Sequence, residues 1–122
     1  MEIASPVNGE RVGEVAVLRG RRRGPWDPDR QHLWLLAGPR QGAANLWVHP
    51  EEIVPADDGA WESRPYIGGE PGVFHRLVVG VVDEAGHELI SGHIANRASE
   101  PFEGGPPPGF IQLVEISVEK TR

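Results

Sequence analysis

The sequence predicts an all-β domain, and three observations lead to that fold class. Glycine supplies 16 and proline 12 of the 122 residues, and both residue types interrupt helices. Runs rich in β-branched and aromatic residues recur between these breakers, as short strands do. Apolar residues make up 39% and charged residues 25% of the chain, which is enough apolar material for one packed core. We therefore expect residues 1–122 to form a single domain, and we exclude a helical bundle and a collagen-like repeat.

The first half of the chain carries three strand signals. Residues 15–19 form a mixed but strand-like run before a turn region that extends to Pro28. Residues 32–37 are almost continuously apolar and end at a Gly-Pro pair, which predicts a central strand covered on both faces, or on one face plus a loop. Residues 45–49 follow a glycine-containing connection, so we expect a hairpin with the preceding strand.

Two further strands follow a turn signal. The sequence Asp57-Asp58-Gly59 is a turn signal. An Asp-Gly pair reverses the chain readily because glycine accepts positive φ. A short strand around Trp61 should come next. Residues 73–82 are the most strand-like segment of the chain, and we expect them in the middle of a sheet.

The last third predicts a short helix, a loop and a closing strand. Apolar and long side chains recur every three or four residues within 84–97 and would share one helix face: Leu89, Ile90, His93, Ile94 and Arg97. Gly86 and Gly92 weaken this helix by about 1 kcal/mol each relative to alanine. Residues 100–109 are proline-rich and should be irregular. Apolar and polar residues alternate from Val114 onward, as in a strand with one solvent-exposed face.

About seven short strands in this length predict an antiparallel β-sandwich. We expect its single core to contain a set of strand residues from both halves of the chain: Leu33, Trp34 or Trp47, Leu35, Leu77, Val79, Val81, Val114 and Ile116. Of the other tryptophans, Trp61 should also be buried. Trp26 lies in a loop between Pro25 and Pro28 and should be the most exposed.

The opening of the chain resembles a known family. Residues 3–9 read Ile-Ala-Ser-Pro-Val-Asn-Gly, and the likeness continues through the strand signals to residue 82. In its opening and in these strand signals, the chain resembles bacterial immunoglobulin-like modules that open with Ser-Pro-x-Asn-Gly. The resemblance implies an immunoglobulin-like fold used as an accessory or interaction domain of a larger bacterial protein, with no catalytic residues to transfer. The arginine-rich insert after Leu18 and the segment 84–109 depart from the family pattern.

Charge and composition exclude several functional classes. Twelve Lys and Arg stand against 18 Asp and Glu, for a net charge of −6, so a general nucleic-acid binder is not expected. The chain has no cysteine, which removes disulfides and thiolate chemistry. No apolar run is long enough for membrane insertion, and the N-terminus lacks a signal peptide. We expect a cytoplasmic location if the chain is complete, and an extracellular or cell-surface one if it is a fragment of an exported protein.

The chain shows no strong catalytic or metal-binding motif. His87 and His93 lie near acidic residues, but a spacing of six on a weak helix places the two rings on different faces. Ser91 precedes His93 without a third partner, and no Gly-x-Ser-x-Gly elbow is present. We therefore predict a non-enzymatic protein with no metal site and no cofactor.

The predicted binding site is the loop that contains Arg19, Arg21, Arg22, Arg23 and Trp26. Four cations and a rigid aromatic side chain suit a protein partner with an acidic patch. The alternative is a carbohydrate-binding module, which needs two exposed aromatic rings with Asp, Glu, Asn or Arg beside them. If the loop is not the site, a sheet edge is the next candidate for a protein partner.

Overall fold

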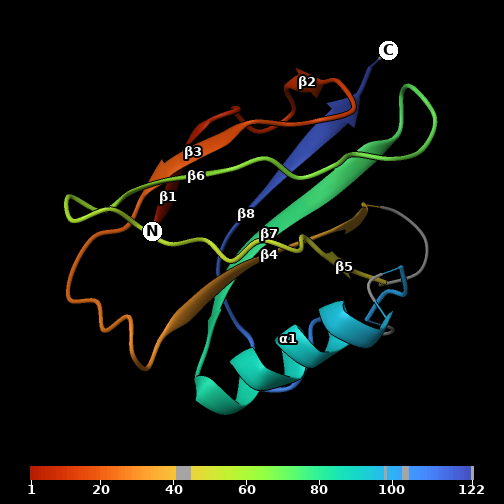
Figure 1. The fold of residues 1–122 in the computed structure, drawn as a ribbon. Coiled ribbons are helices and arrows are strands. Elements are labelled where there is room, and N and C mark those ends of the chain that lie inside the picture. The colour runs from red at the N-terminus through yellow and green to blue at the C-terminus, as the bar shows by residue number, and fades with distance from the viewer. Residues whose placement is uncertain (41–44, 98, 103–104, 122) are drawn as a thin grey trace.

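The computed structural model describes residues 1–40, 45–97, 99–102 and 105–121. They form a mostly β structure with two sheets and one helix (Figure 1). In chain order the elements are β1 (Glu2–Ser5), β2 (Arg11–Val12), β3 (Leu18–Arg21), β4 (His32–Pro39), β5 (Trp47–Val48), β6 (Ala60–Ser63), β7 (Phe74–Val82), α1 (Glu84–Arg97) and β8 (Ile111–Lys120). The all-β class predicted from the breakers and the strand runs is confirmed.

The smaller sheet has the strand order β1-β3-β6 and the larger one the order β2-β8-β7-β4-β5. β7 lies between β8 and β4, so the expected central position of this strand is confirmed. The hairpin partnership of β4 with β5 is confirmed as well. The neighbouring strands are antiparallel except β2, which runs parallel to β8 and pairs Arg11 with Glu119. At this pair the structure departs from the purely antiparallel arrangement that the sequence predicts.

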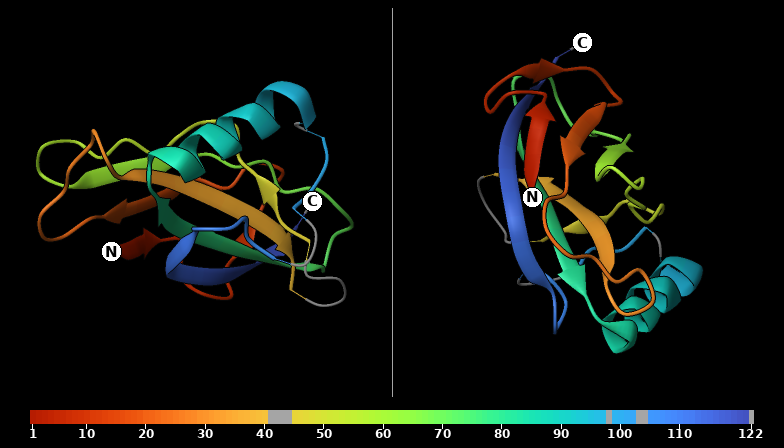
Figure 2. Two further views of the ribbon diagram at one scale, coloured as in Figure 1. Left: turned by 90° about the horizontal axis from the view of Figure 1, so that it is seen from below. Right: turned by 90° about the vertical axis from the view of Figure 1, so that its left-hand side faces the viewer.

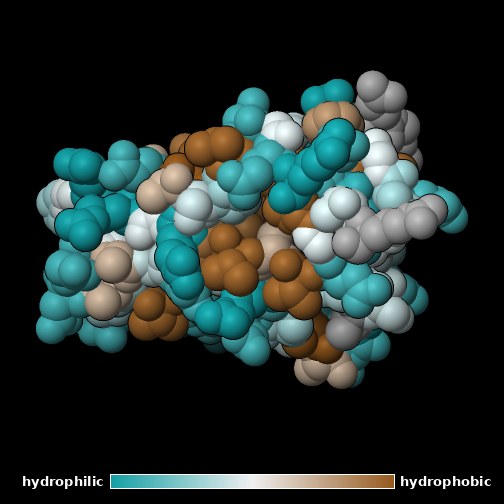
Figure 3. All heavy atoms as spheres, turned by 90° about the horizontal axis from the view of Figure 1, so that it is seen from above, coloured by the Kyte–Doolittle hydropathy of each residue, from teal (hydrophilic) through white to brown (hydrophobic). Residues whose placement is uncertain are grey.

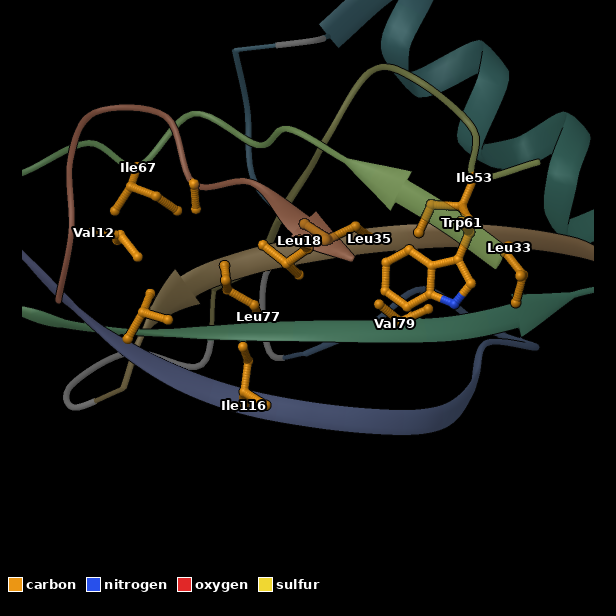
Figure 4. Close-up of a cluster of buried hydrophobic side chains, with 12 residues drawn as sticks. Val12, Leu18, Leu33, Leu35, Ile53, Trp61, Ile67, Leu77, Val79 and Ile116 are labelled. Carbon is orange, nitrogen blue, oxygen red and sulfur yellow. The ribbon is translucent and has the colours of Figure 1, made fainter. Parts of the chain in front are cut away.

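The two sheets enclose a first cluster of buried side chains, which we call the inter-sheet core (Figure 4). In Figure 4 the ring of Trp61 from β6 lies close to Leu33 and Val79 of the larger sheet. The cluster consists of Val12, Ala16, Leu18, Leu33, Leu35, Ile53, Trp61, Ile67, Leu77, Val79, Ile116 and Val118. Because side chains alternate along a strand, only every second residue of β4 and β7 contributes.

The remaining residues of β4 and β7 point to the opposite face, where α1 covers them (Figure 2). This second cluster, the helix-side core, consists of Trp34, Leu36, Leu46, Val48, Val78, Val82 and Ile90. The prediction of a single core is therefore wrong. Both faces of β4 and β7 are apolar, so the larger sheet needs a covering layer on each side. Trp34 and Trp61 are both buried, as expected, but in different cores.

Element boundaries differ from the sequence prediction at two places. The strand expected at 15–19 is β3 and begins at Leu18, while Val15 makes only an isolated bridge to Tyr66. The helix α1 covers the predicted residues 84–97, but Leu89 on its expected inner face is exposed. Among the five residues predicted to share one helix face, only Ile90 is fully buried. Of the predicted loops, residues 41–44, 103 and 104 lie outside the described residues.

Candidate functional site

A groove of about 540 Å³ lies beside β5, the edge strand of the larger sheet. Its lining includes β5 with the residues that follow it, and the segment after β6. The ends of β4 and β7 and the residue before β7 complete the lining. The described lining residues are Ala37, Gly38, Pro39, Trp47, Val48, His49, Pro50, Pro65, Tyr66, Gly68, Gly69, Val73 and His75. Figure 3 shows apolar patches among hydrophilic residues on one face of the molecule.

Two aromatic side chains from different segments, Trp47 and Tyr66, line the groove. Tyr66 is 68% exposed and Trp47 is 39% exposed. The indole of Trp47 is oriented by its Nε1–H, which donates to the carbonyl oxygen of Ser99 at 3.2 Å. The ammonium of Lys120 lies 6.0 Å from the centre of the Tyr66 ring. The groove therefore offers two flat aromatic surfaces, and the Trp47 indole is oriented by a hydrogen bond.

The titratable groups among the described lining residues are Tyr66 and the two histidines. Burial lowers the pKa of His49, although Glu51 opposes this effect. Burial and the charge of Lys120 lower the pKa of His75, against a hydrogen bond with the Gly68 backbone. Both imidazoles are consequently neutral at pH 7. Among the described lining residues there is no Asp, Glu, Lys or Arg, so this groove is uncharged on a protein whose net charge is −6.

A second, smaller pocket of about 250 Å³ adjoins the groove and differs from it in charge. His49 lines both spaces. The other described lining residues of this acidic pocket are Glu51, Glu52, Glu62, Ser63 and Arg64. Hydrogen bonds from Arg64 and Arg19, both at 2.9 Å, lower the pKa of Glu62 and keep it ionised. Ser63 is only 6% exposed, and its Oγ has no hydrogen-bond partner among the described residues.

A third cluster, of ionisable side chains, lies near the first residues of β4 and α1. Nδ1 of His32 is 3.0 Å from Oε2 of Glu52, and its Nε2 is 2.6 Å from Oε1 of Glu84. Burial alone lowers the pKa of His32, but the hydrogen bonds and charges of Glu84 and Glu52 outweigh it and raise the pKa. Two carboxylates facing the two ring nitrogens favour the doubly protonated imidazolium. This cluster ties the residues after β5 to the start of the helix.

His87 completes this cluster and bears on its metal-binding capacity. His32, Glu52 and His87 are the three described residues whose ligand atoms come within 4.8 Å of one another. However, the His32 and His87 rings are stacked, with centroids 3.7 Å apart and planes 16° apart. A metal ion binds about 2 Å from a ring nitrogen and in the ring plane, so stacked rings cannot share one ion unless a ring turns. In addition, Nδ1 of His87 already accepts the indole N–H of Trp34 at 3.2 Å.

The sequence predicts that His87 and His93 lie on different helix faces, and the histidine that contacts His87 in the structure is His32. His93 lies elsewhere, with its Nε2 2.8 Å from the backbone oxygen of Glu100 and its ring stacked on that of Phe102. His32 is distant in sequence and reaches His87 because the register of β4 and β7 places His32 opposite Val82, just before α1. No local spacing signals this contact, because the β4–β7 register creates it.

The predicted loop residues have contacts within the chain. Arg19 lies on β3 and pairs with Glu62 at 2.9 Å, and Arg23 pairs with Glu2 at 3.0 Å. Arg22 donates to the Gly24 carbonyl and lies 5.2 Å from the ring centre of Trp26. Trp26 is partly buried and packs against the inter-sheet core. Trp26 is therefore less exposed than Trp47, contrary to the expected order, while a binding role for the loop stays a prediction.

Comparisons with known proteins leave the geometry as the basis for any functional conclusion. A scan against protein-family models and searches of curated proteins and of solved structures found no match to this chain. No helix in the described part of the chain has the length and apolar character needed to cross a membrane.

Proposed function

We propose that this chain is a non-enzymatic, immunoglobulin-like protein-binding module, and that the groove beside β5 binds an extended segment of a partner protein. The family-like opening at residues 3–9 supports the immunoglobulin-like assignment. The location of the groove at a sheet edge supports a protein partner, because extended segments commonly dock at such edges.

The observation that carries this proposal is the uncharged groove between Trp47 and Tyr66. Aromatic side chains at interfaces provide large contact areas at a small loss of side-chain entropy. Pro39, Pro50 and Pro65 add rigid apolar surface beside them. A groove with these walls favours apolar side chains of a partner and disfavours ionised ones, which would lose hydration without gaining a counter-charge.

A carbohydrate ligand fits the same groove less well. The two exposed aromatic rings meet one requirement of a glycan site. The second requirement, Asp, Glu, Asn or Arg beside those rings, is not met among the described lining residues. Sugar hydroxyls would then have few side-chain partners in the groove, and each unpaired polar group that is desolvated reduces affinity.

A selection from a random peptide library tests the proposal. Peptides displayed on phage are selected on the wild-type protein, and the enriched peptides are measured for binding to Tyr66→Ala and Tyr66→Phe. We expect enriched peptides to bind Tyr66→Phe like wild type and to bind Tyr66→Ala about tenfold more weakly, since only alanine removes the ring. Melting temperatures should agree because the Tyr66 side chain is largely exposed.

Two results would contradict the proposed function. In the first, no peptide is enriched above a control surface. In the second, the enriched peptides bind Tyr66→Ala as tightly as wild type, which places the site elsewhere. A glycan array run in parallel covers the carbohydrate alternative: glycan binding that is lost in Tyr66→Ala, without peptide enrichment, would assign the groove to sugars.

A further inference from the structure

We propose that His87 is a proton-operated switch: neutral, it holds α1 on the larger sheet through Trp34, and protonated, it pairs with Glu52 instead. The switch lies on the helix side of the larger sheet (Figure 2). It does not depend on the function proposed for the groove. The inference follows from the contacts that one imidazole ring makes with β4 and with the segment after β5.

In the structure His87 accepts a hydrogen bond from a buried tryptophan. The indole Nε1–H of Trp34 donates to Nδ1 of His87 at 3.2 Å, and Trp34 is only 4% exposed. A ring nitrogen accepts a hydrogen bond only while it carries no proton, so this contact requires a neutral His87 with its proton on Nε2. Because His87 belongs to α1 and Trp34 to β4, the bond fastens the helix to the sheet.

A second partner for the same nitrogen lies close by. Oε1 of Glu52 is 3.8 Å from Nδ1 of His87, just beyond hydrogen-bond distance. The other oxygen of this carboxylate, Oε2, faces Nδ1 of His32 at 3.0 Å, which leaves Oε1 available. A protonated Nδ1 must donate, and a turn of the ring directs it toward Oε1 and away from Trp34.

The charges next to His87 favour this exchange. The carboxylates of Glu84 and Glu52 raise the pKa of His32, so His32 is protonated in the acid range. Two carboxylates and one imidazolium leave one negative charge in the cluster, which a second proton neutralises. The rings of His32 and His87 are stacked with centroids 3.7 Å apart. Two imidazolium rings repel each other at this distance, which favours the turned position of a protonated His87.

The remaining surroundings of His87 supply no competing charge among the described residues. β7 ends at Val81 and Val82 beside the start of α1 and contributes no ionisable side chain there. The carboxylate of Asp83, just before α1, accepts the backbone N–H of Gly86 at 2.9 Å. The choice of partner for Nδ1 is therefore between Trp34 and Glu52.

The exchange has a local structural consequence. It leaves the indole N–H of Trp34 without an acceptor in the helix-side core, where unpaired polar groups are unfavourable. Ile90, which is fully buried, still holds the middle of α1 against the sheet. Acid should therefore loosen the start of α1 from β4 and leave both sheets folded.

An NMR titration of the tryptophan indole N–H groups between about pH 8 and about pH 5 tests this inference, since histidine titrates in that range. We expect the Trp34 signal to shift as the His87 ring is protonated. Its N–H should also exchange about tenfold faster, relative to its intrinsic rate, in the protonated state. Trp47 and Trp61 are internal controls, because their acceptors, a backbone carbonyl and a thioether sulfur, do not titrate.

Three variants assign the effect. In His87→Gln the amide oxygen can accept from Trp34 but does not titrate, so the Trp34 signal should stay constant. In His93→Gln, the matched control on the same helix, it should titrate as in wild type, because His93 contacts the backbone oxygen of Glu100 instead. Glu52→Gln removes the acceptor of the protonated state and should move the Trp34 transition to lower pH by about half a unit.

Several results would overturn the inference. One is a Trp34 signal in wild type that stays constant while the His87 ring titrates, or a His87 ring that takes up no proton in this range. Another is a Trp34 transition that persists in His87→Gln. Equal acceleration of exchange at Trp47 and Trp61 would show general loosening of the fold. If His87→Gln does not fold, the wild-type titration and the Glu52→Gln shift decide the matter, and an unshifted transition contradicts the switch.

Discussion

His32 is the residue whose surroundings differ most from what its sequence position indicates. It begins β4 in an apolar run, yet its two ring nitrogens face Glu52 and Glu84 at 3.0 and 2.6 Å. His87 stacks on its ring, and Trp34 donates to His87. These groups come from β4, from the segment after β5 and from α1. The protonated His32 therefore links three parts of the chain that are far apart in sequence.

This arrangement predicts a pH dependence of stability. The pKa of His32 is raised above its ordinary value of 6.5, so its contribution is fully present below about pH 6.5 and is lost as the pH rises through the folded-state pKa. In Glu84→Gln the neutral amide replaces one of the two carboxylates. We expect the free energy of unfolding of wild type to fall more steeply above pH 6.5 than that of the variant, measured by urea denaturation at several pH values.

The opposite pH range provides an internal control for this prediction. The lowered pKa values of His49 and His75 give stability that is lost as the pH falls below 6.5, because these buried rings must become charged. Glu84→Gln should leave that acid limb unchanged. Parallel curves for the two proteins above pH 6.5 would contradict the assigned role of His32.

At the scale of elements, α1 shows why two glycines in one helix have different roles. Gly86 is buried in the first turn of α1, and a Cβ added there would lie 2.7 Å from the Cβ of Val82, the last residue of β7. At Gly92 nothing lies within 4 Å of an added Cβ. By helix propensity alone, both glycines weaken the helix. In the structure Gly86 allows the first turn of α1 to pack closely against the end of β7, and the weakening applies to Gly92 alone.

Alanine substitutions at these two positions should have opposite effects. Gly86→Ala should lower the free energy of unfolding by about 1–3 kcal/mol, because the added methyl group overpacks a buried contact. Gly92→Ala should raise it by up to about 1 kcal/mol through helix propensity. Chemical denaturation of both variants measures the two values. A stabilising Gly86→Ala would show that the helix does not pack closely against Val82.

At the scale of the whole molecule, the larger sheet is the middle layer of three. The smaller sheet covers one face and α1 covers the other, so β4 and β7 contribute side chains to both cores (Figures 1 and 2). β7 also has hydrogen-bonded neighbours on both sides. By contrast, β1 and β5 end the two sheets. The groove lies at such an end, where a partner can be added without disturbing either core.

This layering predicts the pattern of amide hydrogen exchange. Amides of β7 should exchange most slowly, since their exposure requires opening both the sheet and the two cores. Amides of β1 should exchange faster, because this strand is paired on one side only. Exchange followed by NMR or mass spectrometry measures both sets. Equal protection of β1 and β7 would contradict the three-layer arrangement.

Most of the strands and the helix of this protein could be predicted from local sequence patterns. The continuous apolar run at residues 32–37 predicted a central strand covered on both faces, or on one face plus a loop, and β4 contributes to both cores. The periodicity within 84–97 located α1, and the Asp57-Asp58-Gly59 turn located β6. These signals are readable because they depend on neighbours within a few residues. The same reasoning named His87 but not its partner His32, and named Trp26 as the exposed tryptophan where Trp47 is more exposed.

Tertiary structure alone decided the layering and the candidate site. The number of cores depends on the position at which α1 packs against the larger sheet. The periodicity of apolar residues within 84–97 does not specify that position. The contact between His32 and His87 depends on the β4–β7 register, and the groove depends on β5, with Trp47, and the segment after β6, with Tyr66, lining one space. Pairing register and docking are set by contacts between residues distant in the chain. Hydrophobic periodicity identifies the faces that must be buried, but many partners can bury them equally well.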